Sequence, residues 1–129
     1  MPARLEHANI TVPDPRATAA ILGRVFGWSV RWEGPAMGDG FTVHVGHEGG
    51  YLALYTGPGG AGHQTPAQDS YRQTGGLNHT GVGGGDLGAR AARGEAEGFA
   101  AHPHAGPEPG GGVYFPDGDG LEYEVASYR

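Results

Sequence analysis

The sequence of 129 residues contains neither cysteine nor lysine. Without cysteine, the chain forms no disulfide and has no thiol nucleophile. Without lysine, it lacks the amine of Schiff-base catalysis and the lysine of a nucleotide-binding P-loop. These absences exclude covalent amine catalysis and nucleotide hydrolysis of the P-loop type.

Positive charge is also scarce. The eight basic residues are all arginine and stand against 14 acidic residues, which gives a formal net charge of −6. Nucleic acid is therefore not an expected partner. No stretch approaches the roughly 20 apolar residues of a membrane span, and residues 1–12 lack the features of a secretory leader. We expect a cytoplasmic protein with no membrane partner.

A weak internal repeat divides the chain. At an offset of 72 residues, the Leu-x-His of residues 5–7 aligns with that of residues 77–79, and Asp14 aligns with Asp86. Self-similarity of this kind predicts two similar structural units. Because neither half alone is long enough to bury a sufficient core, the two units are expected to form one domain together.

Each half is expected to begin with a strand that is followed by a helix. The first helix is expected after Asp14, with Pro15 at the first helical position and Gly27 at the exit. The second is expected after Asp86, over Leu87–Phe99, and two internal glycines weaken it.

Apolar and alternating runs predict the strands Leu5–Val12, Ser29–Glu33, Phe41–Gly46, Tyr51–Thr56, Leu77–Val82, Gly112–Phe115 and Leu121–Ala126, with a weaker strand near Ala100–His104. The order is βαβββ twice, which predicts an α+β fold. Module 1 covers about residues 1–56 and module 2 about residues 77–129. The connection between them, about residues 57–76, is long for a compact domain and is expected to be a functional loop or linker. The run Pro116–Gly120 resembles a calcium loop in composition but lacks the ligand spacing, so we expect a turn.

Alternation along each strand separates a helix-packed set of side chains from a polar set. The polar set comprises His7, Asn9, Thr11, Thr42, His44, Tyr51 and Tyr55 in the first half, and Glu122 and Glu124 in the last strand. Imidazoles, carboxylates and phenols on shared faces suit a polar cavity, and two His with one Glu suit a divalent metal ion. Solvated histidines and cross-strand packing of the tyrosines are the alternatives, and spacing alone does not decide between them.

Three segments resemble the vicinal oxygen chelate superfamily, which includes glyoxalases, bleomycin resistance proteins and extradiol dioxygenases. Residues 5–14 (LEHANITVPD) resemble its opening strand, in which a His is the first metal ligand. Residues 77–82 (LNHTGV) resemble its fifth strand, again with a ligand His. Residues 115–122 (FPDGDGLE) resemble the segment that ends in the ligand carboxylate. The segments occur in the family's order and span nearly the whole chain.

The resemblance implies paired βαβββ modules that form a cupped, partly open mixed barrel with the helices outside. It implies a divalent metal ion (Fe, Mn, Zn, Ni or Co) held by His7, His79 and Glu122. It also implies a homodimer, in which the first His can join a site with the later ligands of the partner. Glyoxalase I enzymes carry a further ligand Glu, whose counterpart here falls at Ala53. The remaining set resembles those of extradiol dioxygenases and fosfomycin-modifying thiol transferases.

The leading functional hypothesis is a metal-dependent enzyme of lyase, dioxygenase or thiol transferase type that acts on a small oxygen-rich molecule. Candidate bases or hydrogen-bonding groups are Glu124, Tyr55, Tyr114 and His44, and candidate substrate contacts are Asn9, His44, Tyr51 and Trp32. The alternative is a metal-free, ligand-sequestering protein of the bleomycin-resistance type, with Trp32, Tyr51, Tyr55 and Tyr114 as its aromatic walls. A third reading is a vestigial member that binds metal without turnover.

Overall fold

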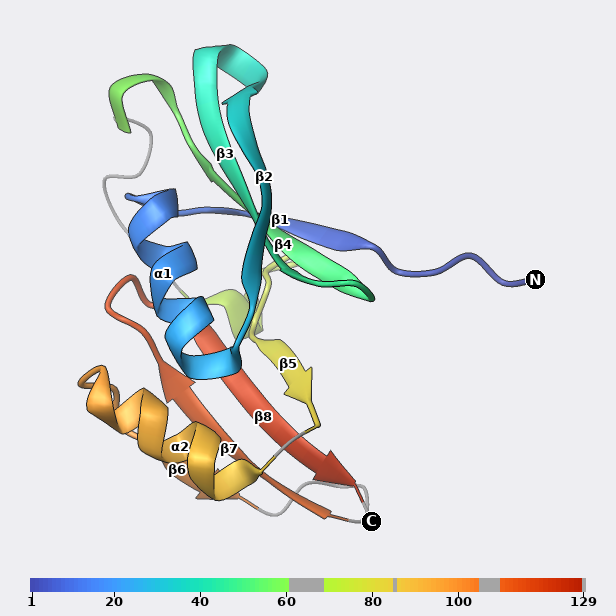
Figure 1. The fold of residues 1–129 in the computed structure, drawn as a ribbon, viewed down its shortest axis with the longest axis vertical. Coiled ribbons are helices and arrows are strands. Elements are labelled where there is room, and N and C mark those ends of the chain that lie inside the picture. Colours follow the sequence, from blue (N-terminus) through green and yellow to red (C-terminus); the bar gives the residue numbers. More distant parts are fainter. Residues whose placement is uncertain (61–68, 85, 105–109, 129) are drawn as a thin grey trace. The chain divides into compact units, whose positions relative to one another are not determined.

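The computed structural model describes residues 1–60, 69–84, 86–104 and 110–128. The chain divides into two compact units, Met1–Thr65 and Pro66–Arg129. Each unit has one α-helix and one mixed four-stranded sheet (Figure 1). The predicted α+β class and the doubled βαβββ order are confirmed.

The first unit forms its sheet in the order β1-β4-β3-β2. Its elements are β1 (His7–Thr11), α1 (Pro15–Phe26), β2 (Ser29–Ala36), the 3-10 turn η1 (Met37–Asp39), β3 (Gly40–His47), β4 (Gly50–Thr56) and the 3-10 turn η2 (Pro58–Gly60). β1 runs parallel to β4, and the other neighbouring strands are antiparallel.

Helix α1 has the limits that the sequence predicts. The Asp14 carboxylate accepts a hydrogen bond from the Ala17 N–H at 3.1 Å, and Pro15 opens the helix. Gly27 ends it in the left-handed region at φ +75°, where glycine carries no Cβ penalty. These signals come from residues at the ends of the helix, so the limits of α1 can be predicted without tertiary contacts.

The first core lies between α1 and its sheet, and α1 packs on β3 and β4. The buried side chains are Ile10, Val12, Leu22, Val25, Phe26, Val43, Val45, Leu52 and Leu54. Strand alternation also places Ala8 and Phe41 on this side of the sheet, but Ala8 is exposed and Phe41 is only partly buried. Ala8 lies on β1, at the edge of the sheet. The opposite faces of β3 and β4 are thereby left to the polar set.

The second unit repeats this topology in the order β5-β8-β7-β6. Its elements are the 3-10 turn η3 (Ser70–Arg72), β5 (Thr80–Gly83), α2 (Leu87–Ala96), β6 (His102–His104), β7 (Gly110–Pro116) and β8 (Glu122–Tyr128). β5 runs parallel to β8, and β7 is antiparallel to β6 and β8. Residues 61–68 of the predicted linker lie outside the described residues.

Two predicted limits in this unit are wrong. Pairing of β5 with β8 begins at Thr80 opposite Tyr123, so His79 lies just before the strand instead of inside it. Helix α2 ends at Ala96, three residues earlier than predicted, and the chain turns at Gly98 with φ +91°. Both limits depend on where the strand finds a partner and where the backbone turns, which the local pattern does not show.

The second core is built on β7 and β8 under α2. Val113, Phe115, Tyr123 and Val125 are buried. Gly94 is the buried residue of α2, and a Cβ at this position would lie 3.5 Å from the Phe115 ring. The glycine that the sequence marks as a weakness of the helix therefore lies at its contact with the sheet.

The run Pro116–Gly120 forms the predicted turn. Asp117 Oδ1 accepts hydrogen bonds from the N–H groups of Asp119 at 2.9 Å and Leu121 at 3.0 Å, and Tyr123 donates its hydroxyl to Oδ2 at 3.4 Å. Burial raises the pKa of this carboxyl. Asp117 thus stabilises the entry to β8, the strand that carries both candidate glutamates.

In the part of the chain that the structure describes, no helix is long and apolar enough to cross a membrane.

Candidate functional site

Strand β8 places two carboxylates on one face of the second sheet. Tyr123 and Val125 are 2% and 0% exposed and point into the core. Glu122 and Glu124 alternate with them and therefore project from the other face. Both glutamates are partly exposed, as expected for groups that line a polar site.

His79 joins this face from the segment that precedes β5. Its Nε2 atom lies 3.4 Å from Oε1 of Glu124, and the two side chains are 29% and 20% exposed. Its Nδ1 atom lies 3.3 Å from the hydroxyl of Tyr71. Both ring nitrogens of His79 therefore have a polar neighbour, one a carboxylate and the other a phenol.

Tyr71 connects His79 to the second glutamate. Its hydroxyl donates to Oε1 of Glu122 at 3.4 Å while it contacts Nδ1 of His79. One oxygen atom thus lies within hydrogen-bond distance of both groups. Burial and the neighbouring Glu122 raise the pKa of Tyr71, so the phenol is neutral at pH 7.

Tyr114 borders the same group on β7. It lies opposite Glu124 in the strand register, and the His79 and Tyr114 rings meet edge to face with centroids 5.2 Å apart. Burial and Glu124 raise the pKa of Tyr114. The second unit thus gathers Tyr71, His79, Tyr114, Glu122 and Glu124, which we call the second-unit cluster.

His7 lies in the first unit, at the start of β1. Its Nδ1 atom lies 2.9 Å from Oε1 of Glu6, and its ring stacks on Tyr51 with centroids 4.9 Å apart. Tyr51 is its direct partner in the parallel register of β1 and β4. The His7 bond is the largest cause of the lowered pKa of Glu6. His7 is thus held from two sides, with its ring nearly parallel to Tyr51.

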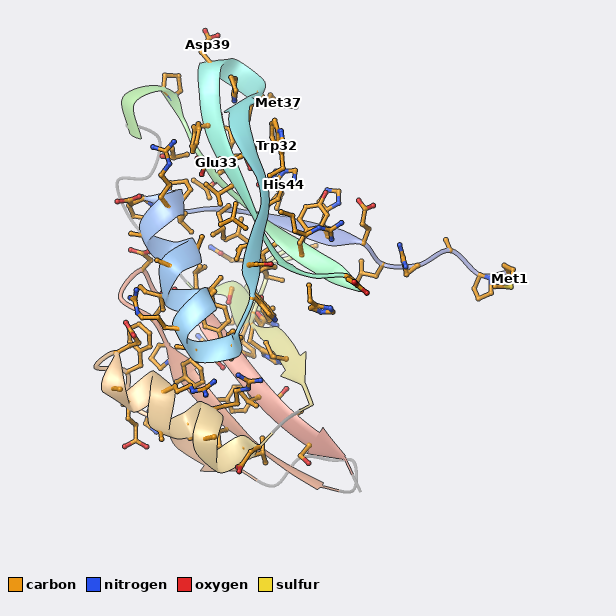
Figure 2. All side chains as sticks on the ribbon, viewed as in Figure 1. Met1, Trp32, Glu33, Met37, Asp39 and His44 are labelled. Atoms are coloured by element: carbon orange, nitrogen blue, oxygen red, sulfur yellow. The ribbon has the colours of Figure 1, made fainter. Side chains whose placement is uncertain are left out.

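An aromatic row continues from His7 across the sheet. His44 stacks on Tyr51 with centroids 4.6 Å apart, and Trp32 lies 5.2 Å from His44. Figure 2 shows Trp32 and His44 side by side, on the side of the strands opposite Glu33, which bonds to Arg16 of α1. We call His7, Tyr51, His44 and Trp32 the aromatic row.

Arg31 places a positive charge beside the aromatic row. Its guanidinium lies over the Tyr51 ring, 4.6 Å from the centroid, and donates to the His47 carbonyl at 3.2 Å. Burial lowers the pKa of His44, and His7 and Arg31 lower it further. The His44 imidazole is therefore neutral at pH 7.

A family model of the Glyoxalase/Bleomycin resistance protein/Dioxygenase superfamily matches residues 4–125. The chain belongs to this superfamily. A search of curated proteins finds no match.

Solved structures of the superfamily share the fold. A glyoxylase/bleomycin resistance protein/dioxygenase domain from Frankia sp. EAN1pec is 20% identical, with a TM-score of 0.81 and full coverage of both chains. The fosfomycin resistance protein FosX from Listeria monocytogenes, in complex with Mn(II) and sulfate, is 19% identical, with a TM-score of 0.72 over 100% of this chain and 95% of FosX. Lactoylglutathione lyase from Agrobacterium tumefaciens is 20% identical, with a TM-score of 0.64 over 98% of this chain and 94% of the lyase.

The candidate metal ligands of this superfamily member are divided between its two units. His79 and Glu122 belong to the second unit and His7 to the first. Among the described residues, no three His, Asp or Glu side chains form a group that could hold a metal ion. The three-ligand site therefore stays a prediction, while the pairing of His79 with Glu122 through Tyr71 is an observed feature.

The other predicted site residues lie at four places. Glu124 and Tyr114 belong to the second-unit cluster, and Tyr51, His44 and Trp32 belong to the aromatic row. Tyr55 donates its hydroxyl to the Met37 carbonyl at 2.7 Å, which fixes it to the η1 turn. Asn9 is exposed on β1 and lies opposite the buried Ala53 in register.

Sequence reasoning missed Tyr71 and Arg31. Tyr71 lies in the connection that the sequence predicts to be functional, but nothing in the local pattern distinguishes it from a loop residue. Its contact with Glu122 spans 51 positions. Arg31 lies next to an irregularity in the β2–β3 register between Val30 and Trp32, which simple alternation does not anticipate.

Proposed function

We propose that the protein is a divalent-metal-dependent enzyme that acts on a small oxygen-rich molecule, with His7, His79 and Glu122 as the metal ligands. One observation carries the proposal. A single atom, the Tyr71 hydroxyl oxygen, reaches both His79 and Glu122, so these two donors already face a common point.

The donor set fits the proposed ion chemically. Imidazole nitrogen and carboxylate oxygen are suitable ligands for Fe, Mn, Zn, Ni and Co. Three protein ligands leave coordination positions open for substrate. When bound, such an ion supplies a Lewis acid that polarises substrate oxygens.

The remaining cluster residues would orient the ligands and move protons. Glu124 contacts His79 and can hold the imidazole in one tautomer, as carboxylates do beside ligand histidines. Glu124 is also the proposed base, because it reaches the same face without being a ligand. Tyr114 borders His79 with its ring, which limits the positions that His79 can take. The Tyr114 hydroxyl is the proposed hydrogen-bond donor to substrate oxygens.

The structural relatives support the type of chemistry. The FosX structure contains Mn(II), and another relative is a lactoylglutathione lyase. The lyase, thiol transferase and dioxygenase types therefore all stay within the general proposal. We further propose a cytoplasmic homodimer, in which His7 completes the site of its own chain or that of the partner.

A metal-free binding protein is the second candidate. The aromatic row favours it, because Trp32 is 51% exposed next to the stacked His44 and Tyr51 rings. An exposed aromatic surface of this kind can sequester a flat ligand without any metal ion. In that case the histidine rings would contact the ligand, and their nitrogen lone pairs would bind no metal ion.

Metal content separates the two candidates. Protein purified without chelator is analysed for transition metals, alongside His7→Ala and His79→Ala. The enzyme proposal predicts about one ion per site in the wild type and loss of the ion in both variants. His47→Ala is the matched control, because His47 is exposed on β3 and contacts Trp28 outside the aromatic row. A metal-free wild type that binds flat ligands would support the second candidate instead.

A further inference from the structure

Tyr71 occupies the point where the two proposed ligands of the second unit meet. Its hydroxyl lies 3.3 Å from Nδ1 of His79 and donates to Oε1 of Glu122 at 3.4 Å. Tyr71 comes from the short turn η3, outside the strands that carry the ligands. The proposed function gives this residue no role.

The hydroxyl blocks ligand lone pairs whichever way its proton points. A phenol has one O–H donor. If it donates to Glu122, it uses a carboxylate lone pair, and the imidazole then meets the phenol oxygen through its own N–H. If it donates to His79, it uses the imidazole lone pair. In either arrangement Nδ1 of His79 cannot bind an ion, because it either carries a proton or accepts one from Tyr71.

The position of Tyr71 allows it to leave. Its residue is 64% exposed, so the ring can rotate into solvent without opening the core. The turn has no side-chain cap, and its preceding residue, Asp69, has the unfavourable φ of +56° for a residue other than glycine. The backbone hydrogen bond from Gln73 to Ser70 is long, at 3.3 Å. A second backbone hydrogen bond, from Arg72 to Asp69, is 2.9 Å long, and no side-chain cap adds to these two bonds.

We propose that Tyr71 is a displaceable cap on the metal site, which occupies the shared point between His79 and Glu122 until a divalent cation replaces its hydroxyl. The proposal rests on the proposed function, because it concerns the same two ligands. It adds regulation to that site: cation binding has to break the two contacts of Tyr71, so the affinity is lower than that of the uncapped ligands.

Titration with Mn(II) tests the cap. Free Mn(II) is measured by electron paramagnetic resonance in the presence of the full chain, as wild type, Tyr71→Phe and Ser70→Ala. Tyr71→Phe keeps the ring and removes the hydroxyl, so it should bind Mn(II) about 3- to 10-fold more tightly, the worth of roughly one hydrogen bond. Ser70→Ala changes a neighbouring side chain of the same turn and should bind like the wild type.

Amide hydrogen exchange of residues 69–73 gives a readout that is independent of affinity. In the wild type, Mn(II) should speed exchange in this segment because the Tyr71 side chain is released. In Tyr71→Phe, exchange should already be fast and should not change with Mn(II).

The outcomes separate the cap from the proposed function. Unchanged or weaker Mn(II) binding by Tyr71→Phe, with a wild type that binds, overturns the cap and leaves the proposed function standing. Slower exchange on Mn(II) addition also overturns it, because Tyr71 would then be a retained partner of the site. If neither protein binds Mn(II), the proposed function fails and the cap fails with it.

Discussion

Nε2 of His79 lies 3.4 Å from Oε1 of Glu124, on the side of the ring opposite its contact with Tyr71. A carboxylate at this nitrogen fixes the orientation of the imidazole and raises its basicity. Glu124 can therefore influence metal binding without being a ligand.

Glu124→Gln should weaken Mn(II) binding by about tenfold, the lower end of the effect expected for a carboxylate that supports a ligand histidine. The amide keeps the shape of the side chain and removes its charge. Glu95→Gln is the control, since Glu95 is exposed on α2 and its loss changes the net charge equally. Equal affinities of the two variants, measured by the same titration, would rule out a role of Glu124 in holding His79.

Asp117 should be important for stability through the turn that precedes β8. Asp117→Ala leaves the N–H groups of Asp119 and Leu121 without their acceptor, and we expect the free energy of unfolding to fall by about 2 kcal/mol. Asp117→Asn keeps an acceptor oxygen, so its free energy of unfolding should fall much less. Urea denaturation measures both, and a calcium loop would instead predict that added Ca²⁺ stabilises the wild type.

The same residue predicts a pH dependence of stability. Burial raises the pKa of Asp117 above its ordinary value of 3.8, so the folded chain holds the proton more tightly than the unfolded chain. The stabilisation of the folded chain by this bound proton is present below pH 3.8 and is lost as the pH rises through the raised pKa. The free energy of unfolding of the wild type should therefore decrease relative to that of Asp117→Asn across this range. A constant difference between the two proteins would contradict the prediction.

Alanine substitutions at two glycines near the end of α2 should change the stability of the chain in opposite directions. Gly94→Ala should stabilise the chain by about 0.5–1 kcal/mol, because the helix gains a better residue and the new Cβ meets Phe115 at an ordinary contact distance of 3.5 Å. Gly98→Ala should destabilise by about 1 kcal/mol, because Gly98 has φ +91°. Thermal unfolding of both variants checks the pair, and stabilisation by Gly98→Ala would show that the end of α2 is misplaced.

His44 should titrate below its ordinary pKa of 6.5, because burial, His7 and Arg31 all disfavour its charged form. The stability that depends on neutral His44 is present above pH 6.5 and is lost as the pH falls through the lowered pKa. His7→Gln and Arg31→Gln should each move the pKa of His44 upward. Proton NMR of the imidazole signals measures these shifts, and an unshifted His44 in the wild type would contradict the stacked arrangement.

The sequence predicts those features that depend on neighbours along the chain. Asp14 and Gly27 mark the limits of α1 because a cap and a left-handed exit act within one turn of helix. The start of β5 is different, because it depends on the pairing of Thr80 with Tyr123. Alternation alone cannot supply that register.

The candidate site follows the same division. Alternation on β8 separates Glu122 and Glu124 from the core residues Tyr123 and Val125, as the sequence predicts. The contacts of Tyr71 with His79 and Glu122 were not predictable, since they depend on how a connection folds back onto the sheet. The bulge beside Trp32 hid the contact between Arg31 and Tyr51 for a similar reason.

Anomalous diffraction from crystals grown with Mn(II) would locate the ion and its protein ligands. We expect one strong peak at each site, with a nitrogen of His7, a nitrogen of His79 and an oxygen of Glu122 as its protein ligands at about 2.0–2.2 Å. The His7 ligand comes from the same chain or from the partner subunit. A structure in which His79 and Glu122 surround no ion, or in which His7 lies far from the ion in both chains, would contradict the proposed metal centre.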